Sequence, residues 1–234
     1  MLTRRVAFRT DGWFFPLMGL TALAVVGVGF APTYYLGFWF NAPALAPIVH
    51  IHAAAFTAWL LLLLSQTFFI RTGRFRWHRA MGKAAVALVV VMVVTGYMVI
   101  VGKPRPTAAV RAFIFTPMLS LLLFPIFVAA AIHFRRDPAT HKRLMLLATM
   151  AIATAGMSRL MLKVGLDPTH YRAYAATYVV LLLPLLTFDL ARLGTLHRAT
   201  AWGSALLLVR HVLHQAIANT DQWQRIAAWL TPPV

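Results

Sequence analysis

Long hydrophobic runs, separated by short polar segments, make up most of this chain of 234 residues. A helix needs about 20 apolar residues, at a rise of about 1.5 Å each, to cross a hydrocarbon layer of about 30 Å. Seven runs meet this requirement, at residues 13–36, 46–70, 80–101, 110–133, 143–164, 171–190 and 198–218. The pattern therefore predicts an all-α integral membrane bundle of seven transmembrane helices, with residues 1–234 forming a single transmembrane domain.

Prolines punctuate these runs. Most of them fall where a helix has to stop, at positions 32, 43, 47, 104, 106, 138 and 168. Pro117, Pro125 and Pro184 lie inside the fourth and sixth runs instead. Proline removes a backbone donor and clashes with the preceding turn, so these three predict bends within the helices.

A short amphipathic segment follows the last run, at residues 221–230. Trp223, Ile226, Ala227 and Leu230 recur there at spacings of three and four, which places them on one face of a helix. A short helix with one apolar face is typical of the membrane–water interface. We predict a short C-terminal interfacial helix, lying flat on the membrane.

The basic residues predict the orientation. Lys and Arg number fourteen in the N-terminus and the segments 71–83, 135–143 and 192–198, against six in the alternate segments. Cytoplasmic segments carry the excess of Lys and Arg. The sequence thus predicts a bacterial inner-membrane protein with its N-terminus in the cytoplasm and its C-terminus outside.

Composition excludes several classes of function. The net charge of +17 lies at the ends of the runs, which favours contact with anionic lipid head groups over binding of nucleic acid. No cysteine is present, which excludes disulfides and thiolate metal sites. The seventh run has no lysine to form a retinal Schiff base, and Asp189 alone among the carboxylates lies in a run. A light-driven opsin is excluded, and a carboxylate-based proton carrier is disfavoured.

The histidines form two layers on this topology. His78, His133, His141 and His197 lie at the predicted cytoplasmic ends, mostly beside Lys or Arg, and are interpreted as head-group anchors. The outer layer is the candidate cofactor site. His52 in the second run and His214 in the seventh lie at similar depth, so we expect them to approach each other as ligands of one metal, either haem iron or Zn or Cu.

Four further residues complete the candidate cofactor site: His50, His211, Arg159 and Arg210. His50 is two positions from His52 and so points away from it on a helix. A charged side chain inside a bilayer costs about 2.5–3.5 kcal/mol on insertion scales and therefore needs a reason. Arg159 and Arg210 either extend to the outer head groups or bind an acidic partner such as haem propionates.

Several segments carry a resemblance. The stretch His50–Trp59, Gln66 and Trp77–Gly82 resembles a family of bacterial multi-pass membrane proteins of unknown function, as do His141–Met145 and Leu196–Gly203. The resemblance covers nearly the whole chain. It implies a multi-pass inner-membrane protein and carries no activity over. His211 and His214 lie outside the shared pattern.

Three functions remain open. The first is a haem-b or metal-binding redox protein that transfers electrons, with quinone as a candidate partner. The second is a non-enzymatic accessory or assembly subunit of a larger membrane complex. The third is a zinc-dependent membrane hydrolase, similar in plan to the adiponectin-receptor and alkaline-ceramidase superfamily. Against the third, the spacing of three between His211 and His214 departs from that superfamily's pattern, and no acidic partner lies beside them.

Overall fold

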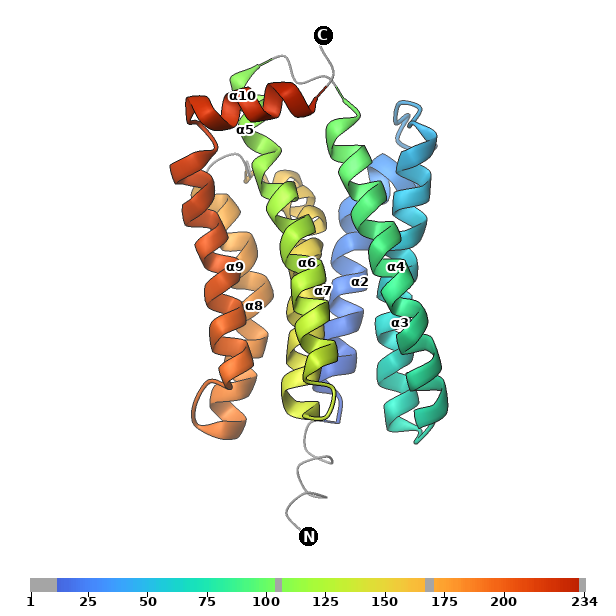
Figure 1. Ribbon diagram of the computed structural model, residues 1–234. Coiled ribbons are helices and arrows are strands. Elements are labelled where there is room, and N and C mark those ends of the chain that lie inside the picture. The colour runs from blue at the N-terminus through green and yellow to red at the C-terminus, as the bar shows by residue number, and fades with distance from the viewer. Residues whose placement is uncertain (1–11, 104–106, 167–170, 232–234) are drawn as a thin grey trace.

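The computed structural model describes residues 12–103, 107–166 and 171–231, and in these ranges its only regular elements are helices. They are α2 (Phe14–Phe30), the π-helical turn η1 (Ala31–Tyr35), α3 (Pro47–Arg71), α4 (Phe75–Val101), α5 (Ala108–Phe113), α6 (Phe115–His133), α7 (Pro138–Lys163), α8 (Tyr171–Leu193), α9 (Arg198–Ile217) and α10 (Asp221–Leu230). The long helices run side by side with alternating direction (Figure 1). We call the end at which α2 begins the lower end, and the end that carries α10 the upper end.

Six helical segments are long and apolar enough to cross a membrane. They are Phe14–Tyr35, Pro47–Arg71, Phe75–Val101, Ala108–His133, Pro138–Lys163 and Ala176–Leu193. The chain is therefore a multi-pass membrane protein. The remaining predicted span corresponds to α9, which has 20 residues and packs on α6, α7 and α8. Its composition is less apolar because it carries Arg210, His211 and His214 in one stretch.

Helix α7 forms the centre of the bundle. It packs on α2, α6, α8 and α9, and thirteen of its residues are buried. Small residues allow the closest contact, which α7 makes with α2: a Cβ placed on Gly29 would lie 2.4 Å from the carbonyl oxygen of Gly156. Close backbone approach at small residues is the usual way in which membrane helices pack tightly.

The prolines act differently along the chain. The sequence predicts that the first helix stops at Pro32, and this is wrong. The chain continues through Pro32 as the π-helical turn Ala31–Tyr35. The fourth span is divided at Ile114 into α5 and α6, and Pro117 lies in the first turn of α6. Pro117 has no N–H to donate to the carbonyl of Phe113, which accounts for a break at this place. Pro125 and Pro184 lie within continuous helices.

The C-terminal segment is helical, as predicted, and α10 lies across the upper end of the bundle (Figure 1). Trp223 anchors it by donating its ring N–H to the carbonyl of Arg111 at 3.0 Å, and Arg111 donates to the side-chain oxygen of Gln224 at 2.9 Å. Trp229 on the other face is 83% exposed. A helix held on one side, with an exposed tryptophan on the other, suits the interface.

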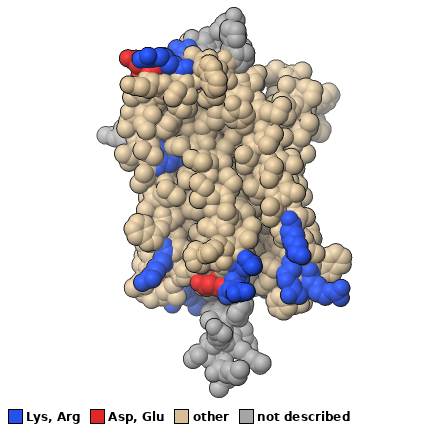
Figure 2. Space-filling view, viewed as in Figure 1, with Lys and Arg blue, Asp and Glu red and all other residues tan. Residues whose placement is uncertain are grey.

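Charged side chains gather at the two ends of the bundle. Figure 2 shows Lys and Arg mainly near the lower and upper rims, with an almost uncharged surface between them. Such a band is the surface that a hydrocarbon layer requires.

Candidate functional site

His52, in the upper half of α3, faces α4. Its Nδ1 lies 3.0 Å from the hydroxyl of Thr95, and that hydroxyl donates to the carbonyl of Val91 at 2.7 Å. The threonine oxygen therefore accepts, and His52 donates from Nδ1, which leaves Nε2 with its lone pair. Gly96 makes room for the ring, because a Cβ there would lie 3.0 Å from Cε1 of His52.

His214, in the upper half of α9, is held by a different helix. Its Nδ1 lies 3.0 Å from the hydroxyl of Thr116 on α6. Helix α3 packs on α2 and α4, while α9 packs on α6, α7 and α8. The expected packing of the second span on the seventh is thus wrong, because α3 lies on the α2 and α4 side of the bundle and α9 on the α6, α7 and α8 side. Metal binding by His52 and His214 stays a prediction, and the structure gives it no shared helix contact.

The other upper residues have separate surroundings. His50 is exposed and its ring lies 5.6 Å from that of Tyr34, on the side away from His52, as the spacing predicts. Arg159 lies with its guanidinium 4.0 Å from the ring centre of Phe30 and donates to a carbonyl of its own helix. The side chain of His211 falls outside the described part of the structure.

Arg210 is the most deeply buried cation of the upper half, with 1% of its surface exposed. Its guanidinium donates to the hydroxyl of Ser120 on α6 and lies 4.4 Å from the ring centre of Tyr178 on α8. Of the two alternatives for this residue, extension to the outer head groups is therefore wrong. Arg210 joins three helices in the interior.

The lower end brings two histidines together that sequence reasoning assigned to separate anchors. The rings of His78 on α4 and His141 on α7 have their centres 6.4 Å apart, at an angle of 84°. His141 donates from Nδ1 to the carbonyl of Ala131 at 2.7 Å, since a carbonyl can only accept. The Nε2 of His141 consequently keeps a free lone pair. The Nδ1 of His78 is buried and has no hydrogen-bond partner among the described residues.

Gln66 adds an unsatisfied amide beside this pair. Both its side-chain nitrogen and its oxygen are buried without a partner in the part of the chain that the structure describes. A Cβ on Gly82 would lie 3.9 Å from the amide oxygen, and Gly82 is one turn above His78 on the same face of α4. A buried polar group without a partner costs about 1–3 kcal/mol, and the three such atoms of Gln66 and His78 call for an explanation.

A buried ion pair lies nearby at the lower end. Arg143 on α7 donates from Nε and Nη2 to Oδ1 of Asp189 on α8, at 3.0 and 2.5 Å, and both side chains are almost fully buried. Asp189 also accepts the backbone N–H of His197 at 3.1 Å. The only carboxylate within a span is thus committed to structure.

His197 caps α9 at this end. Its Nδ1 accepts the backbone N–H of Ala199 at 3.2 Å, which requires the neutral ring. Burial lowers the pKa of His197, and the neighbouring Arg143 lowers it further, although Asp189 opposes the effect. This histidine is a helix cap, and its interaction is with the protein backbone instead of a head group.

Among the described residues no group of three or more His, Asp or Glu side chains is placed to hold a metal ion. The pair at the lower end, His78 and His141, offers two imidazole rings. Sequence reasoning missed it because His78 and His141 are separated by more than sixty positions and each stands beside basic residues. The one available signal was Gln66, the only amide side chain of the second run, four residues before the end of that run.

Comparison of the chain with family models, with curated proteins and with solved structures gives no match. The resemblance to bacterial multi-pass proteins described above stays a prediction.

Proposed function

We propose that this multi-pass membrane protein holds a redox-active metal, haem iron or copper, between His78 and His141, and that it transfers electrons at the lower end. The observation that carries the proposal is the approach of these two rings to 6.4 Å between centres. With metal–nitrogen bonds of about 2.0–2.1 Å and about 1 Å from nitrogen to ring centre, two imidazoles on opposite sides of one metal have centres about 6 Å apart.

The surroundings of the pair support ligation. A metal-binding histidine usually donates its other ring N–H to a carbonyl or carboxylate, which fixes the tautomer and the ring orientation. The bond from His141 to the Ala131 carbonyl at 2.7 Å has this form. The buried Nδ1 of His78 and the amide of Gln66 are available as further polar contacts of a bound group.

Electron transfer fits these residues better than hydrolysis. A catalytic zinc site usually has three protein ligands and an open position for water, and a hydrolase commonly adds a carboxylate as base. Of the described carboxylates, Asp189 is paired with Arg143, and Asp137 caps α7 by accepting from the backbone of Ala139 and Thr140. Neither is free to act as a base at the lower end, and the third described carboxylate, Asp221, lies at the upper end. Imidazole suits zinc as well as iron and copper, so it is the lack of a third ligand and of a base among the described residues that disfavours hydrolysis.

The topology that goes with this function has seven spans, with the lower end in the cytoplasm. Helix α9 is as long as a span, packs along α7 and α8, and buries Arg210 toward the interior. The excess of Lys and Arg at the lower end favours a cytoplasmic location for that end, and therefore for the N-terminus. Reporter fusions at residues 196 and 220 are expected to fall on opposite sides of the inner membrane. Reporters on the same side would show that α9 does not cross the membrane.

The redox claim is tested by spectroscopy of the purified protein. We expect an absorption band in the oxidised protein that shifts on reduction with dithionite: a Soret band for haem, or a visible or paramagnetic signal for copper. His78→Ala and His141→Ala should each lose the signal. His133→Ala is the matched control. His133 lies at the lower end of the bundle, at the end of α6, and is exposed, and its ring packs against that of Phe134.

A protein with no iron, no copper and no reducible signal contradicts the proposal and leaves a non-enzymatic accessory subunit as the better account. Zinc bound at the lower pair would favour the hydrolase. Loss of the signal in His52→Ala or His214→Ala, with His78→Ala unaffected, would move the site to the upper layer.

A further inference from the structure

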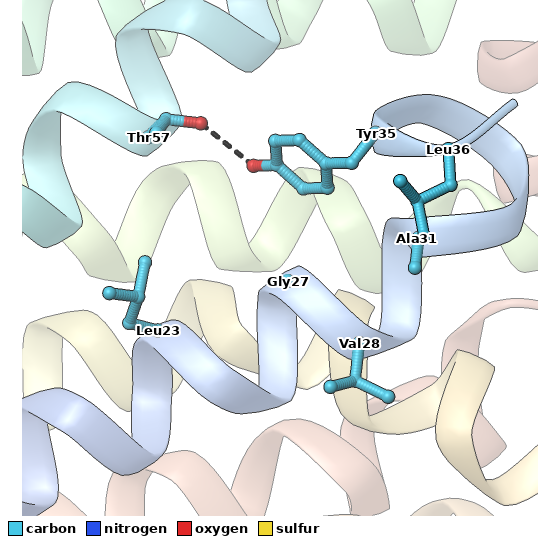
Figure 3. Close-up of a pocket in the computed structure, with 7 residues that line it drawn as sticks. All are labelled: Leu23, Gly27, Val28, Ala31, Tyr35, Leu36 and Thr57. Carbon is cyan, nitrogen blue, oxygen red and sulfur yellow. Dashed lines mark hydrogen bonds between the residues drawn. The ribbon is translucent and has the colours of Figure 1, made fainter.

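Two hollows lie along the contact between α2 and α3. The upper hollow, of about 340 Å³, is lined by Leu23, Gly27, Val28, Ala31, Tyr35, Leu36 and Thr57 (Figure 3). The lower hollow, of about 500 Å³, is lined by Trp13, Pro16, Leu17, Leu20, Leu64, Thr67, Phe68, Arg71 and Thr72. Both volumes fall within the range of about 300–1,000 Å³ that small-ligand sites occupy.

The two hollows are parts of one seam. Their lining positions on the α2 side recur within each turn from Trp13 to Ala31. Those on α3 are Thr57 and, two turns further on, Leu64, Thr67, Phe68, Arg71 and Thr72. Each set therefore lies on one face of its helix. From Thr57 to Arg71 the seam extends about 21 Å at 1.5 Å per residue. This exceeds the half-thickness of the hydrocarbon layer, about 15 Å, so a lipid chain can lie in it along its whole length.

The lower mouth of the seam is basic and aromatic. The Arg71 guanidinium lies 3.8 Å from the ring centre of Trp13 and donates to the carbonyl of Gly12. Arg74 lies beside it, with its guanidinium 5.6 Å from the ring centre of Phe68. Arginine has five donors, and its planar fork matches the oxygens of a phosphate. None of the described carboxylates lines either hollow.

The upper end of the seam is uncharged. Thr57 donates to the carbonyl of Ala53 at 2.8 Å, so the hydroxyl of Tyr35 donates to Thr57 at 2.7 Å. Tyr35 comes from the π-helical turn, a form that is frequent at functional sites. Above Gly27 the space is open, with no atom within 4 Å of a Cβ placed there. Hydrocarbon is the matching occupant for this part.

We propose that the seam binds one anionic glycerophospholipid, with its phosphate at Arg71 and an acyl chain between α2 and α3 as far as Tyr35. The charge of the lower mouth selects an acidic head group, and the apolar walls select the chain. The site is independent of the metal centre proposed above, which lies between α4 and α7.

Native mass spectrometry of the full chain tests the site, with micelles that contain equal amounts of phosphatidylglycerol and phosphatidylcholine as the probe. We expect one phosphatidylglycerol to be retained in preference to phosphatidylcholine. Arg71→Ala should lower its retention at least about tenfold, as expected for loss of a charge-assisted contact. Arg135→Ala, an exposed cation of the same end that lines neither hollow, should leave retention unchanged.

Gly27→Leu provides a second test at the other end of the seam. No atom lies within 4 Å of a Cβ placed on Gly27, so we expect the new side chain to enter open space and block the path of the acyl chain while the fold is retained. We expect it to lower retention of phosphatidylglycerol although no charge changes. Equal retention of the two lipids, or retention in both Arg71→Ala and Gly27→Leu at the level of the natural protein, would overturn the proposal.

Discussion

The lower and upper ends of the bundle hold their polar residues in opposite ways. At the lower end His78 and His141 come from two helices to one place, and a buried pair joins Arg143 to Asp189. At the upper end His52 and His214 are bonded separately, each to a threonine on a different neighbouring helix. Polar side chains that meet without partners indicate a ligand. Those that are already satisfied indicate structure.

The largest effect is expected from breaking the ion pair of the lower end. Asp189→Ala leaves the Arg143 guanidinium buried without its carboxylate, and removing one partner of such a pair costs about 3–5 kcal/mol. The free energy of unfolding, measured by denaturation in detergent, should fall by this amount. The double variant Arg143→Met with Asp189→Leu should recover most of it. A loss under about 1 kcal/mol for Asp189→Ala would show that the pair does not hold α7 to α8.

Close packing at the upper end of α2 is expected to give the next largest effect. Gly29→Ala places a methyl group 2.4 Å from the backbone oxygen of Gly156, so one helix has to move. Overpacking of this kind costs about 1–3 kcal/mol. Gly27→Ala is the matched control on the same helix, and it should be neutral or slightly stabilising because its space is open. Equal effects from the two changes would contradict the contact.

The two histidine layers differ in how their members should couple. His52→Ala and His214→Ala each remove a hydrogen bond and should cost about 0.5–1.5 kcal/mol. Their double variant should be additive within about 0.3–0.5 kcal/mol, because His52 bonds Thr95 on α4 and His214 bonds Thr116 on α6. His78→Ala with His141→Ala should instead show a coupling of about 0.5–3 kcal/mol. Strong coupling between His52 and His214 would restore the upper site.

The smallest expected effect is a pH dependence at the cap of α9. Burial lowers the pKa of His197 in the folded chain below its ordinary value of 6.5. As the pH falls below 6.5, His197 therefore becomes protonated in the unfolded chain before it does in the folded chain. The stability that this residue contributes is present above about pH 6.5 and is lost as pH falls toward the lower pKa of the folded state. His197→Asn keeps an N-cap acceptor and should reduce the fall in unfolding free energy between about pH 7 and 5. An unchanged pH profile in the variant would contradict this assignment.

The hydrophobic pattern predicts most of this fold because spans are set by length and composition. The second run, 46–70, agrees closely with α3 at Pro47–Arg71. Helices α4 and α7 begin five residues earlier than predicted, at Phe75 and Pro138. The hydrophobic run marks the part of the helix inside the membrane, and the basic residues before it, at the membrane surface, are also helical. His78 and His141 therefore lie within helices. The periodicity of α10 also predicts its helix correctly.

The site is harder to predict because it depends on which helices are neighbours. The similar depth of His52 and His214, and the cost of exposing Arg210, His211 and His214 to lipid, predict that the two histidines pair. Many helices of a bundle have residues at the same depth, so depth does not identify neighbours. The packing of α6 and α7 through the centre decides that these two histidines are separated. Arg210 shows the same limit of prediction from sequence. Its position predicts that burying its charge in the membrane costs free energy, and its contacts with Ser120 and Tyr178, which offset that cost, are known only from the structure.

Metal content of the purified chain tests the difference between the two layers most directly. Three proteins are compared by inductively coupled plasma mass spectrometry: the natural sequence, the double variant His78→Ala with His141→Ala, and the double variant His52→Ala with His214→Ala. We expect about one equivalent of iron or copper in the first and third and none in the second, since neutral imidazole is the ligand that these metals share. Metal retained in the lower double variant, or absent from all three, would contradict a metal centre at the lower end.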